Sequence, residues 1–216
     1  MIITMDGPAG SGKSTVAKEV SKKLNFIHFN SGLLYRGITA HLSKLNFDIE
    51  SIKINSKVPK FKLKTKFIDN IQHVFVNDTD YTAVLRDNNI SKLTPFVSTN
   101  KVIRKRIDKC QREFAKFNNI VVDGRDTGSF VFPRADFKFY LDCSIKERAK
   151  RRFNEEKVKN PSITLSQIEQ ELETRDHIDK TKKIAPLVVP KNAIVIDSTN
   201  LNIQEVVETI LKQLKN

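Results

Sequence analysis

Eight residues near the start of the chain have the types and spacing of a phosphate-binding loop. They read Gly7-Pro8-Ala9-Gly10-Ser11-Gly12-Lys13-Ser14 and match the pattern G-x-x-x-x-G-K-S, with Thr15 directly after them. Glycines let successive backbone N–H groups converge on phosphate oxygens, and the positive end of a following helix adds to the attraction. We expect Lys13 to reach the β- and γ-phosphates and the Ser14 hydroxyl to bind Mg²⁺. The alternative, a glycine-rich turn that matches by chance, fits the flanking strand and helix patterns less well.

A second group of charged residues follows an apolar run in Val121-Val122-Asp123-Gly124-Arg125-Asp126. If the run is a strand of an open α/β sheet, these charges lie at the carboxyl edge, where ligands bind. Asp123 could hold Mg²⁺ through water, and the planar guanidinium of Arg125 could clamp a phosphate. The alternative is a simple turn at Asp123-Gly124 with a surface ion pair.

Two later stretches are strongly basic. The first contains Arg148, Lys150, Arg151 and Arg152, and the second runs from 175 to 183. A run of charges is usually a solvated helix face, and that alternative stays open. Beside a phosphate-binding loop, cations on a mobile segment suit an enzyme that closes over ATP and neutralises a transferring phosphoryl group.

A short polar turn precedes a helical pattern in Asn30-Ser31-Gly32-Leu33-Leu34-Tyr35-Arg36. An arginine in the second turn of such a helix would suit an acceptor phosphate. The alternative is an ordinary N-cap followed by a surface arginine.

The apolar patterning indicates how these segments are positioned. Short apolar runs predict strands at 2–5, 26–29, 120–122, 137–141 and 193–196. Three- and four-residue spacing predicts helices at 13–24, after 30–32, from about 102 to 117, after 144–147, at 168–175, and after 202–205. Alternating segments between about 48 and 87 predict a small antiparallel meander. Strands that alternate with helices imply a parallel sheet covered by helices on both faces.

Composition limits the class of protein. The chain has 216 residues, 39% of them hydrophobic and 29% charged, which is ordinary for a folded domain. A net charge of +13 favours an anionic partner such as a nucleotide, a nucleic acid or an acidic membrane surface. No apolar run approaches the roughly 18 to 20 residues that a membrane span needs, and no signal peptide is evident. Two cysteines cannot build a disulfide framework, so we expect a cytoplasmic protein.

Together these segments resemble the bacterial cytidylate kinases, which transfer the γ-phosphoryl group of ATP to CMP or dCMP. The resemblance covers nearly the whole chain, through GPAGSGKST, NSGLLYR, the insertion, VVDGRDTGS followed by VFPRADFKFYLD, ERAKRR, TRD with IAPL, and AIVIDST. DGRD with its following proline is more selective than the phosphate-binding loop. Adenylate kinases share the loop but lack DGRD, and shikimate kinases normally carry a glycine triplet in its place.

The resemblance implies roles for individual residues. It assigns the acceptor phosphate to Arg36 and Arg125, the cytosine ring to Ser31, Arg104 and Asp126, and the ribose to Arg175 and Asp179. Lys13 and the lid arginines Arg148, Arg151 and Arg152 would serve ATP and the transferring group. Lys182 would contact the pyrimidine.

Three positions depart from the family pattern. Pro95 stands where the family often has a serine near the sugar, and Ile178 replaces an arginine of the usual R-D-x-R-D run. Lys182 replaces an arginine, and its ammonium cannot reproduce a bidentate planar fork. These changes bear on affinity, sugar preference and lid closure.

The resemblance also implies a domain organisation. The fold is a P-loop NTPase-type, doubly wound parallel sheet with an NMP-binding insertion at about 48–87 and a mobile basic lid at about 148–175. The core comprises 1–47, 88–147 and 176–216. We expect a monomer that binds ATP, Mg²⁺, CMP and dCMP, with no nucleic-acid or membrane partner. Two alternatives are a broader UMP/CMP kinase and, from another class, a P-loop regulatory or nucleic-acid-binding ATPase.

Overall fold

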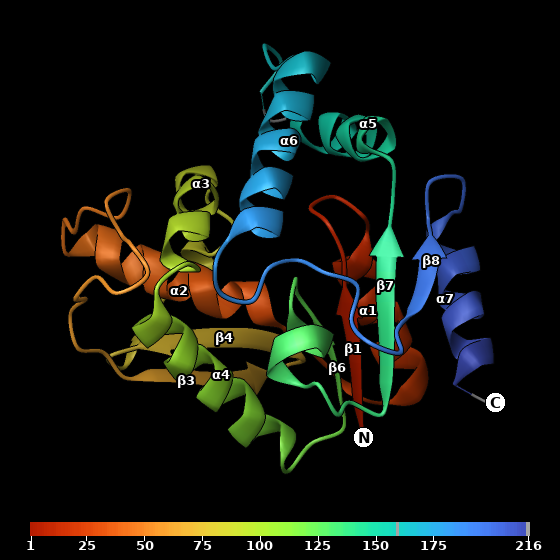
Figure 1. Cartoon of the computed structure of the whole chain (residues 1–216), viewed down its shortest axis with the longest axis horizontal. Coiled ribbons are helices and arrows are strands. Elements are labelled where there is room, and N and C mark those ends of the chain that lie inside the picture. Colours follow the sequence, from red (N-terminus) through yellow and green to blue (C-terminus); the bar gives the residue numbers. More distant parts are fainter. Residues whose placement is uncertain (159, 215–216) are drawn as a thin grey trace. The chain divides into compact units, whose positions relative to one another are not determined.

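The computed structural model describes residues 1–158 and 160–214, and these form two compact units (Figure 1). The first unit comprises 1–28 and 120–216, and the second comprises 29–119. Within the described residues, no helix has both the length and the apolar character that a membrane crossing requires. Residue 159 of the predicted lid and residues 215–216 of the predicted core lie outside the described residues.

The first unit is built on a parallel sheet in the order β2-β6-β1-β7-β8. The strands are β1 (Ile2–Asp6), β2 (Ile27–Asn30, which continues into the second unit), β6 (Ile120–Asp123), β7 (Phe137–Asp142) and β8 (Ile194–Asp197). Ile3 pairs with Val121 on one side and with Phe137 on the other, so β1 is central. The chain goes from β1 to one side of the sheet and later to the other, which places a topological switch point at the carboxyl end of β1.

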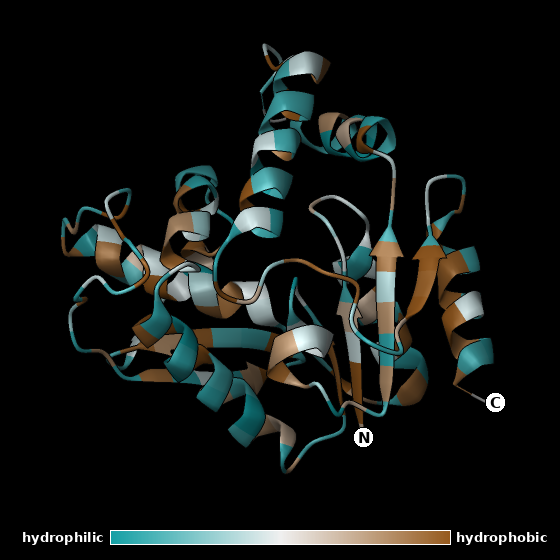
Figure 2. Cartoon of the chain, in the orientation of Figure 1, coloured by the Kyte–Doolittle hydropathy of each residue, from teal (hydrophilic) through white to brown (hydrophobic). Residues whose placement is uncertain are grey.

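The core of the first unit lies between this sheet and two helices, α1 (Lys13–Leu24) and α7 (Ile203–Gln213). Val16 and Val20 of α1 and Val207 of α7 pack with strand residues such as Phe139. The apolar strands are mostly brown in Figure 2, and α7 carries brown patches on its inner side. Burying each such side chain contributes on the order of 2 kcal/mol.

Two further helices, α5 (Ile145–Glu156) and α6 (Leu165–Thr181), lie side by side after the carboxyl end of β7 (Figure 1). Ala149, Ile168 and Leu172 form a separate small core with Ala9 of the glycine loop. Ser144 caps α5, and Thr164 forms a reciprocal capping box with Gln167 at the start of α6. These helices hold the basic residues that the sequence singled out.

The second unit combines helices with a small antiparallel sheet. Strands β3 (Leu63–Ile68), β4 (Ile71–Val76) and β5 (Thr79–Asp80) form a meander followed by the 3₁₀ turn η1 (Thr82–Val84). The helices are α2 (Ser31–Lys44), α3 (Asn88–Val97) and α4 (Lys101–Ala115). At Gly37 of α2 an added Cβ would lie 2.4 Å from a methyl carbon of Val74, so this helix can approach β4 only with glycine there.

The structure confirms the predicted parallel sheet and the small antiparallel sheet. Helix α1 has the predicted bounds, whereas α6 is longer than predicted because its capping box begins at Thr164. Helix α3 was missed: its interior holds Pro95, which ordinarily argues against a helix, but Asp87 caps two of its amides. The π-helical turn η2 (Thr127–Val131) was missed as well.

Candidate active site

The glycine loop joins the end of β1 to the start of α1. Gly7 has a φ of +154°, and a Cβ there would lie 2.2 Å from the carbonyl oxygen of Leu141, so no larger residue fits. Gly12 caps α1 in the left-handed region, with a φ of +83°. This geometry leaves backbone amides at the N-terminus of a 12-residue helix, which is an arrangement that binds anions.

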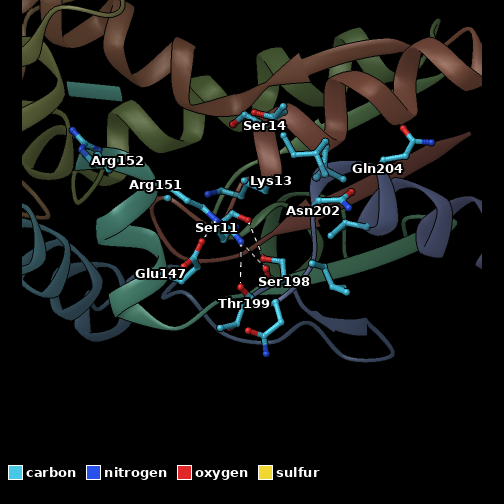
Figure 3. Close-up of a pocket in the computed structure, with 18 of the residues that line it drawn as sticks. Ser11, Lys13, Ser14, Glu147, Arg151, Arg152, Ser198, Thr199, Asn202 and Gln204 are labelled. Carbon is cyan, nitrogen blue, oxygen red and sulfur yellow. Dashed lines mark hydrogen bonds and ion pairs between the residues drawn. The ribbon is translucent and has the colours of Figure 1, made fainter. Parts of the chain in front are cut away.

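A cavity of about 1000 Å³ opens beside this loop. It is lined by Gly10 to Val16, by Glu147, Arg151, Arg152 and Glu155 of α5, and by residues 198–204 and Val206 after β8. In Figure 3, Arg151 lies between Glu147 and Ser198, and Ser198 lies next to Ser11. Arg151 donates to the Glu147 carboxylate at 3.0 Å and to the Ser198 carbonyl at 2.7 Å. The cavity has the volume and the donors for a nucleotide.

Lys13 lies in the loop with its side chain folded back. Its Nζ donates to the Pro8 carbonyl oxygen at 2.8 Å, and the residue is only 5% exposed. Burial lowers the pKa of Lys13 well below its usual value, and the charges of Arg125 and Arg175 lower it further. Phosphate oxygens at this position would favour the charged form of Lys13.

Three side chains form a hydrogen-bonded chain: Ser14 in the first turn of α1, Asp123 at the end of β6, and His28 within β2. The Ser14 hydroxyl donates to Asp123 Oδ2 at 2.5 Å, and His28 Nε2 lies 2.7 Å from Asp123 Oδ1. Burial works to raise the pKa of Asp123, but the hydrogen bonds from His28 and Ser14 and the charge of Lys13 hold it below its usual value.

This oxygen pair fits a divalent metal that arrives with a phosphate ligand. Among residues 1–158 and 160–214 there is no cluster of three or more His, Cys, Asp or Glu side chains that could hold a metal alone. Mg²⁺ usually takes one or two protein oxygens together with water and substrate phosphates. A hydroxyl and an ionised carboxylate, both hard ligands, meet that requirement.

Arg125, Asp179 and Lys182 form an ionic cluster between the end of β6 and the end of α6. Arg125 Nε lies 2.9 Å from Asp179 Oδ2, and Lys182 Nζ lies 3.8 Å from Oδ1. Burial alone would raise the pKa of Asp179, but Arg125, Lys182 and Arg175 lower it, so this carboxylate is ionised. The cluster brings together three of the predicted site residues.

Arg148 is buried, and it links three segments of the first unit. Its guanidinium donates to the carbonyls of Cys143 and Ala9, both at 2.9 Å, and to Asp176 Oδ2 at 2.6 Å. Arg152, one turn further along α5, pairs with Glu156 at 2.8 Å. The three arginines of α5 therefore have different surroundings, and Arg151 and Arg152 line the cavity.

The second unit holds three further predicted residues. Ser31 is the buried first residue of α2, after the N-cap Asn30. Arg36 donates to the Leu85 carbonyl and the Ser91 hydroxyl, both at 2.8 Å. Arg104, on α4, donates to the Ser98 carbonyl at 3.2 Å and lies over the ring of Tyr35.

Sequence reasoning missed two buried or partly buried polar residues on the strands of the parallel sheet, His28 on β2 and Asp6 at the end of β1. Neither His28 nor Asp6 is among the site residues that the sequence predicts. Asp6 is the last residue of the parallel strand β1, and that position is the signal that could have identified it.

Asp6 is completely buried, and its carboxylate accepts hydrogen bonds from Thr127 and Gly128. Burial raises the pKa of Asp6 from 3.8 to about 6; these hydrogen bonds oppose the rise, and the charge of Asp126 adds to it. Because the folded state binds this proton more tightly than the unfolded chain, the contribution of Asp6 to stability improves as the pH falls from above 6 toward 3.8.

This linkage predicts a pH-dependent difference between the wild type and Asp6→Asn. Lowering the pH from about 7.5 to about 5 should raise the free energy of unfolding of the wild type by about 1 kcal/mol relative to the variant. Titrations shared by both proteins cancel in this comparison. Urea denaturation at the two pH values measures the difference, and a constant difference would show that the pKa of Asp6 is not raised.

Comparisons with known proteins identify the family of this chain. Residues 3–216 match the family model described as cytidylate kinase. A cytidylate kinase from Caldicellulosiruptor saccharolyticus is 40% identical over 97% of this chain and 93% of its own length. One from Pediococcus pentosaceus is 37% identical over 99% of this chain and 95% of its own length.

A solved structure supports the fold. An uncharacterized protein from Eubacterium ventriosum superposes with a TM-score of 0.56 at 12% identity, over 100% of this chain and 99% of its own. That likeness concerns the fold only. The family model and the relatives extend over nearly the full length, and the chain belongs to the cytidylate kinase family.

Proposed function

We propose that this protein transfers the γ-phosphoryl group of ATP to CMP and dCMP, forming ADP and the nucleoside diphosphate. The observation that carries the proposal is the phosphate-binding loop beside the Ser14–Asp123 pair and the Arg125–Asp179 cluster, in a chain of this family. Cations, a metal site and an anion-binding helix end are what phosphoryl transfer requires.

The donor side is assigned to the loop and to α5. Backbone amides of residues 7–15 would bind the phosphates of ATP, and Lys13 would neutralise the β- and γ-oxygens. Arg151 and Arg152 line the cavity and would contact ATP and the transferring group. Arg148, with its three hydrogen bonds, would act from its fixed position beside Ala9. Ser14, and Asp123 through water, would hold Mg²⁺, which supplies charge neutralisation when bound with ATP.

The acceptor side is assigned to the remaining predicted residues. Arg36 and Arg125 would bind the phosphate of CMP, and Arg175 and Asp179 its ribose. The cytosine ring would be read by Ser31, Arg104 and Asp126, with Lys182 as a further donor. Ionised Asp179 can accept hydrogen bonds from ribose hydroxyls, which supports its assignment.

The reaction needs positioning more than covalent chemistry. An oxygen of the CMP phosphate forms a bond to the γ-phosphorus, and the bond to the β,γ-bridging oxygen breaks, leaving ADP. Charge on the transferring group is spread over three oxygens, so fixed cations stabilise it. Alignment of acceptor and donor can supply several kcal/mol of the barrier reduction.

The proposal also covers the insertion, the lid, the oligomeric state and the location of the protein. Residues 48–87 would serve as the acceptor-binding insertion and residues 148–175 as a lid that excludes water. The protein would work as a cytoplasmic monomer, with nucleotides as its only partners.

Replacing either arginine that is proposed to bind the acceptor phosphate should impair the kinetics with CMP much more than those with ATP. We expect each variant, Arg36→Met and Arg125→Met, to raise the KM for CMP and to lower kcat, because the acceptor is no longer aligned. In each variant, kcat/KM for CMP should fall by about 100-fold or more. The KM for ATP should change much less. Initial rates with each substrate varied in turn measure this, and a loss confined to ATP would mean that these arginines serve the other nucleotide.

One assay separates the kinase from an ATPase that acts on nucleic acid. The protein is incubated with ATP, Mg²⁺ and CMP, and in parallel with RNA or DNA in place of CMP, and the products are separated by chromatography. We expect CDP and ADP in equal amounts in the first reaction and no stimulated hydrolysis in the second. Stimulated ATP hydrolysis without nucleoside diphosphate would overturn the proposal.

A further inference from the structure

The carboxylate of Asp6 binds the segment that follows the DGRD motif. Its Oδ1 accepts hydrogen bonds from the Thr127 amide at 2.8 Å and the Thr127 hydroxyl at 2.7 Å. Its Oδ2 accepts one from the Gly128 amide at 2.7 Å. Both oxygens are therefore engaged, and only a group that accepts at both positions satisfies these donors.

The same segment fixes the backbone at Asp126. Asp126 is the N-terminal cap of η2, and its carbonyl oxygen accepts from the amides of Phe130 at 2.9 Å and Val131 at 3.1 Å. Thr127 and Gly128 are the first two residues of this π-helical turn. A π-helical turn is an uncommon conformation, and here its first amides are held from outside by Asp6.

Close packing at Gly128 makes the attachment specific. A Cβ on Gly128 would lie 2.6 Å from Thr4 Oγ1 and 3.3 Å from Asp6 Oδ2. The turn therefore sits directly on the end of β1, with no room for a side chain between them. Any displacement of Thr127 is transmitted through one peptide bond to Asp126, and any displacement of Gly128 through two.

We propose that Asp6 is a positioning residue for base selection, which acts by holding η2 and thereby the side chain of Asp126 in register with the acceptor base. The inference rests on the proposed role of Asp126 in reading cytosine. Asp6 also immediately precedes the phosphate-binding loop, so one buried carboxylate ties the start of the donor loop to the acceptor-reading segment of the same unit.

Asp6→Asn tests the proposal with almost no change in volume. The amide places an N–H group against either the Gly128 amide or the Thr127 donors, so at least one hydrogen bond becomes a donor–donor contact. We expect the ratio of kcat/KM for CMP to that for UMP to fall by about 10- to 100-fold, mainly through a higher KM for CMP. The KM for ATP should change by less than about threefold.

Three further variants make the result specific. Gly128→Ala displaces the turn without altering Asp6, and it should give the same kinetic pattern even if Asp6→Asn folds poorly. Thr127→Val removes one of the three hydrogen bonds and should have a smaller effect. Val207→Ala, in the core between α7 and the sheet, should lower Tm without changing the CMP/UMP ratio.

A double-mutant cycle distinguishes positioning from general stability. Because Asp6 acts through Asp126, adding Asp6→Asn to Asp126→Ala should change the CMP/UMP ratio no further. Additive effects on that ratio would overturn the proposal, as would a folded Asp6→Asn with an unchanged ratio or with equal losses for CMP and ATP. If Asp126→Ala alone leaves the ratio unchanged, the assignment of Asp126 is wrong, which is a separate result.

Discussion

Lys13→Ala should abolish phosphoryl transfer, lowering kcat by about 1000-fold or more, while the fold stays intact. In its proposed role, the lysine supplies positive charge where the β- and γ-phosphates bind, and losing a preorganised charge at such a position costs about this much. The free protein should tolerate the change. Burial already lowers the pKa of Lys13, so its charge is costly to the folded state before phosphate binds.

The measurement compares circular dichroism, thermal unfolding and the transfer rate for the wild type and the variant. Lys18→Ala is the matched control, because it removes the same charge from an exposed position of α1. Lys18→Ala should retain the wild-type rate. A near-normal rate in Lys13→Ala would remove this lysine from the mechanism.

Asp126→Ala should change which base the enzyme accepts. Cytosine presents an exocyclic amino group, a donor, where uracil presents a carbonyl oxygen, an acceptor. A carboxylate at this position accepts a hydrogen bond from the amino group of cytosine but is repelled by the carbonyl oxygen of uracil. A buried polar group left unpaired by the wrong ligand can reject it by up to about 10⁴-fold. Asp126 is 5% exposed, so water offers it little alternative.

The variant loses both the attraction and the repulsion. Its kcat/KM for CMP should fall strongly, whereas its kcat/KM for UMP should fall little or rise, since the proposed roles of Arg104 and Lys182 as donors to either ring are kept. Both constants are measured at one Mg²⁺ and ATP concentration, with the exposed Glu208→Ala as a carboxylate control. An unchanged CMP/UMP ratio would show that Asp126 does not read the base.

Local patterns predicted the elements and motifs that short stretches of sequence encode. The glycine loop, the 13–24 helix and the apolar strands each depend on neighbours within a few residues, and the structure contains them. The same holds for the caps at Ser144 and Asn202, whose partners lie three residues away. The positions of Lys13, Ser14 and Asp123 at the carboxyl edge followed from these elements.

Contacts between distant residues could not be predicted in this way. The bonds of Arg148 to Ala9 and Asp176 join residues 139 and 28 positions apart, and a run of basic residues gives no sign of them. The bonds of Asp6 to Thr127 and Gly128 span more than 120 positions. Helix α3 was missed because a proline such as Pro95 ordinarily argues against a helix. The helix forms nevertheless, since the cap at Asp87 and the burial of Ile90 and Val97 outweigh the hydrogen bond that Pro95 cannot make.

Two of the family departures can now be placed. Pro95 lies inside α3, where its carbonyl accepts from the Ser98 hydroxyl at 2.7 Å. Lys182 is the C-cap of α6, and its ammonium lies 3.8 Å from Asp179 without the planar fork that an arginine would offer. A lysine here should discriminate between pyrimidines less than an arginine, which leaves more of the base selection to Asp126.

The most direct measurement of the central claim is kcat/KM for CMP, dCMP, UMP and AMP with the wild-type protein, at fixed ATP and Mg²⁺. The arrangement of Asp126, Arg125 and the phosphate-binding loop predicts that CMP and dCMP are phosphorylated with the highest efficiency and that UMP follows far behind, by up to about 10⁴-fold. A wild type that prefers UMP or AMP would contradict it.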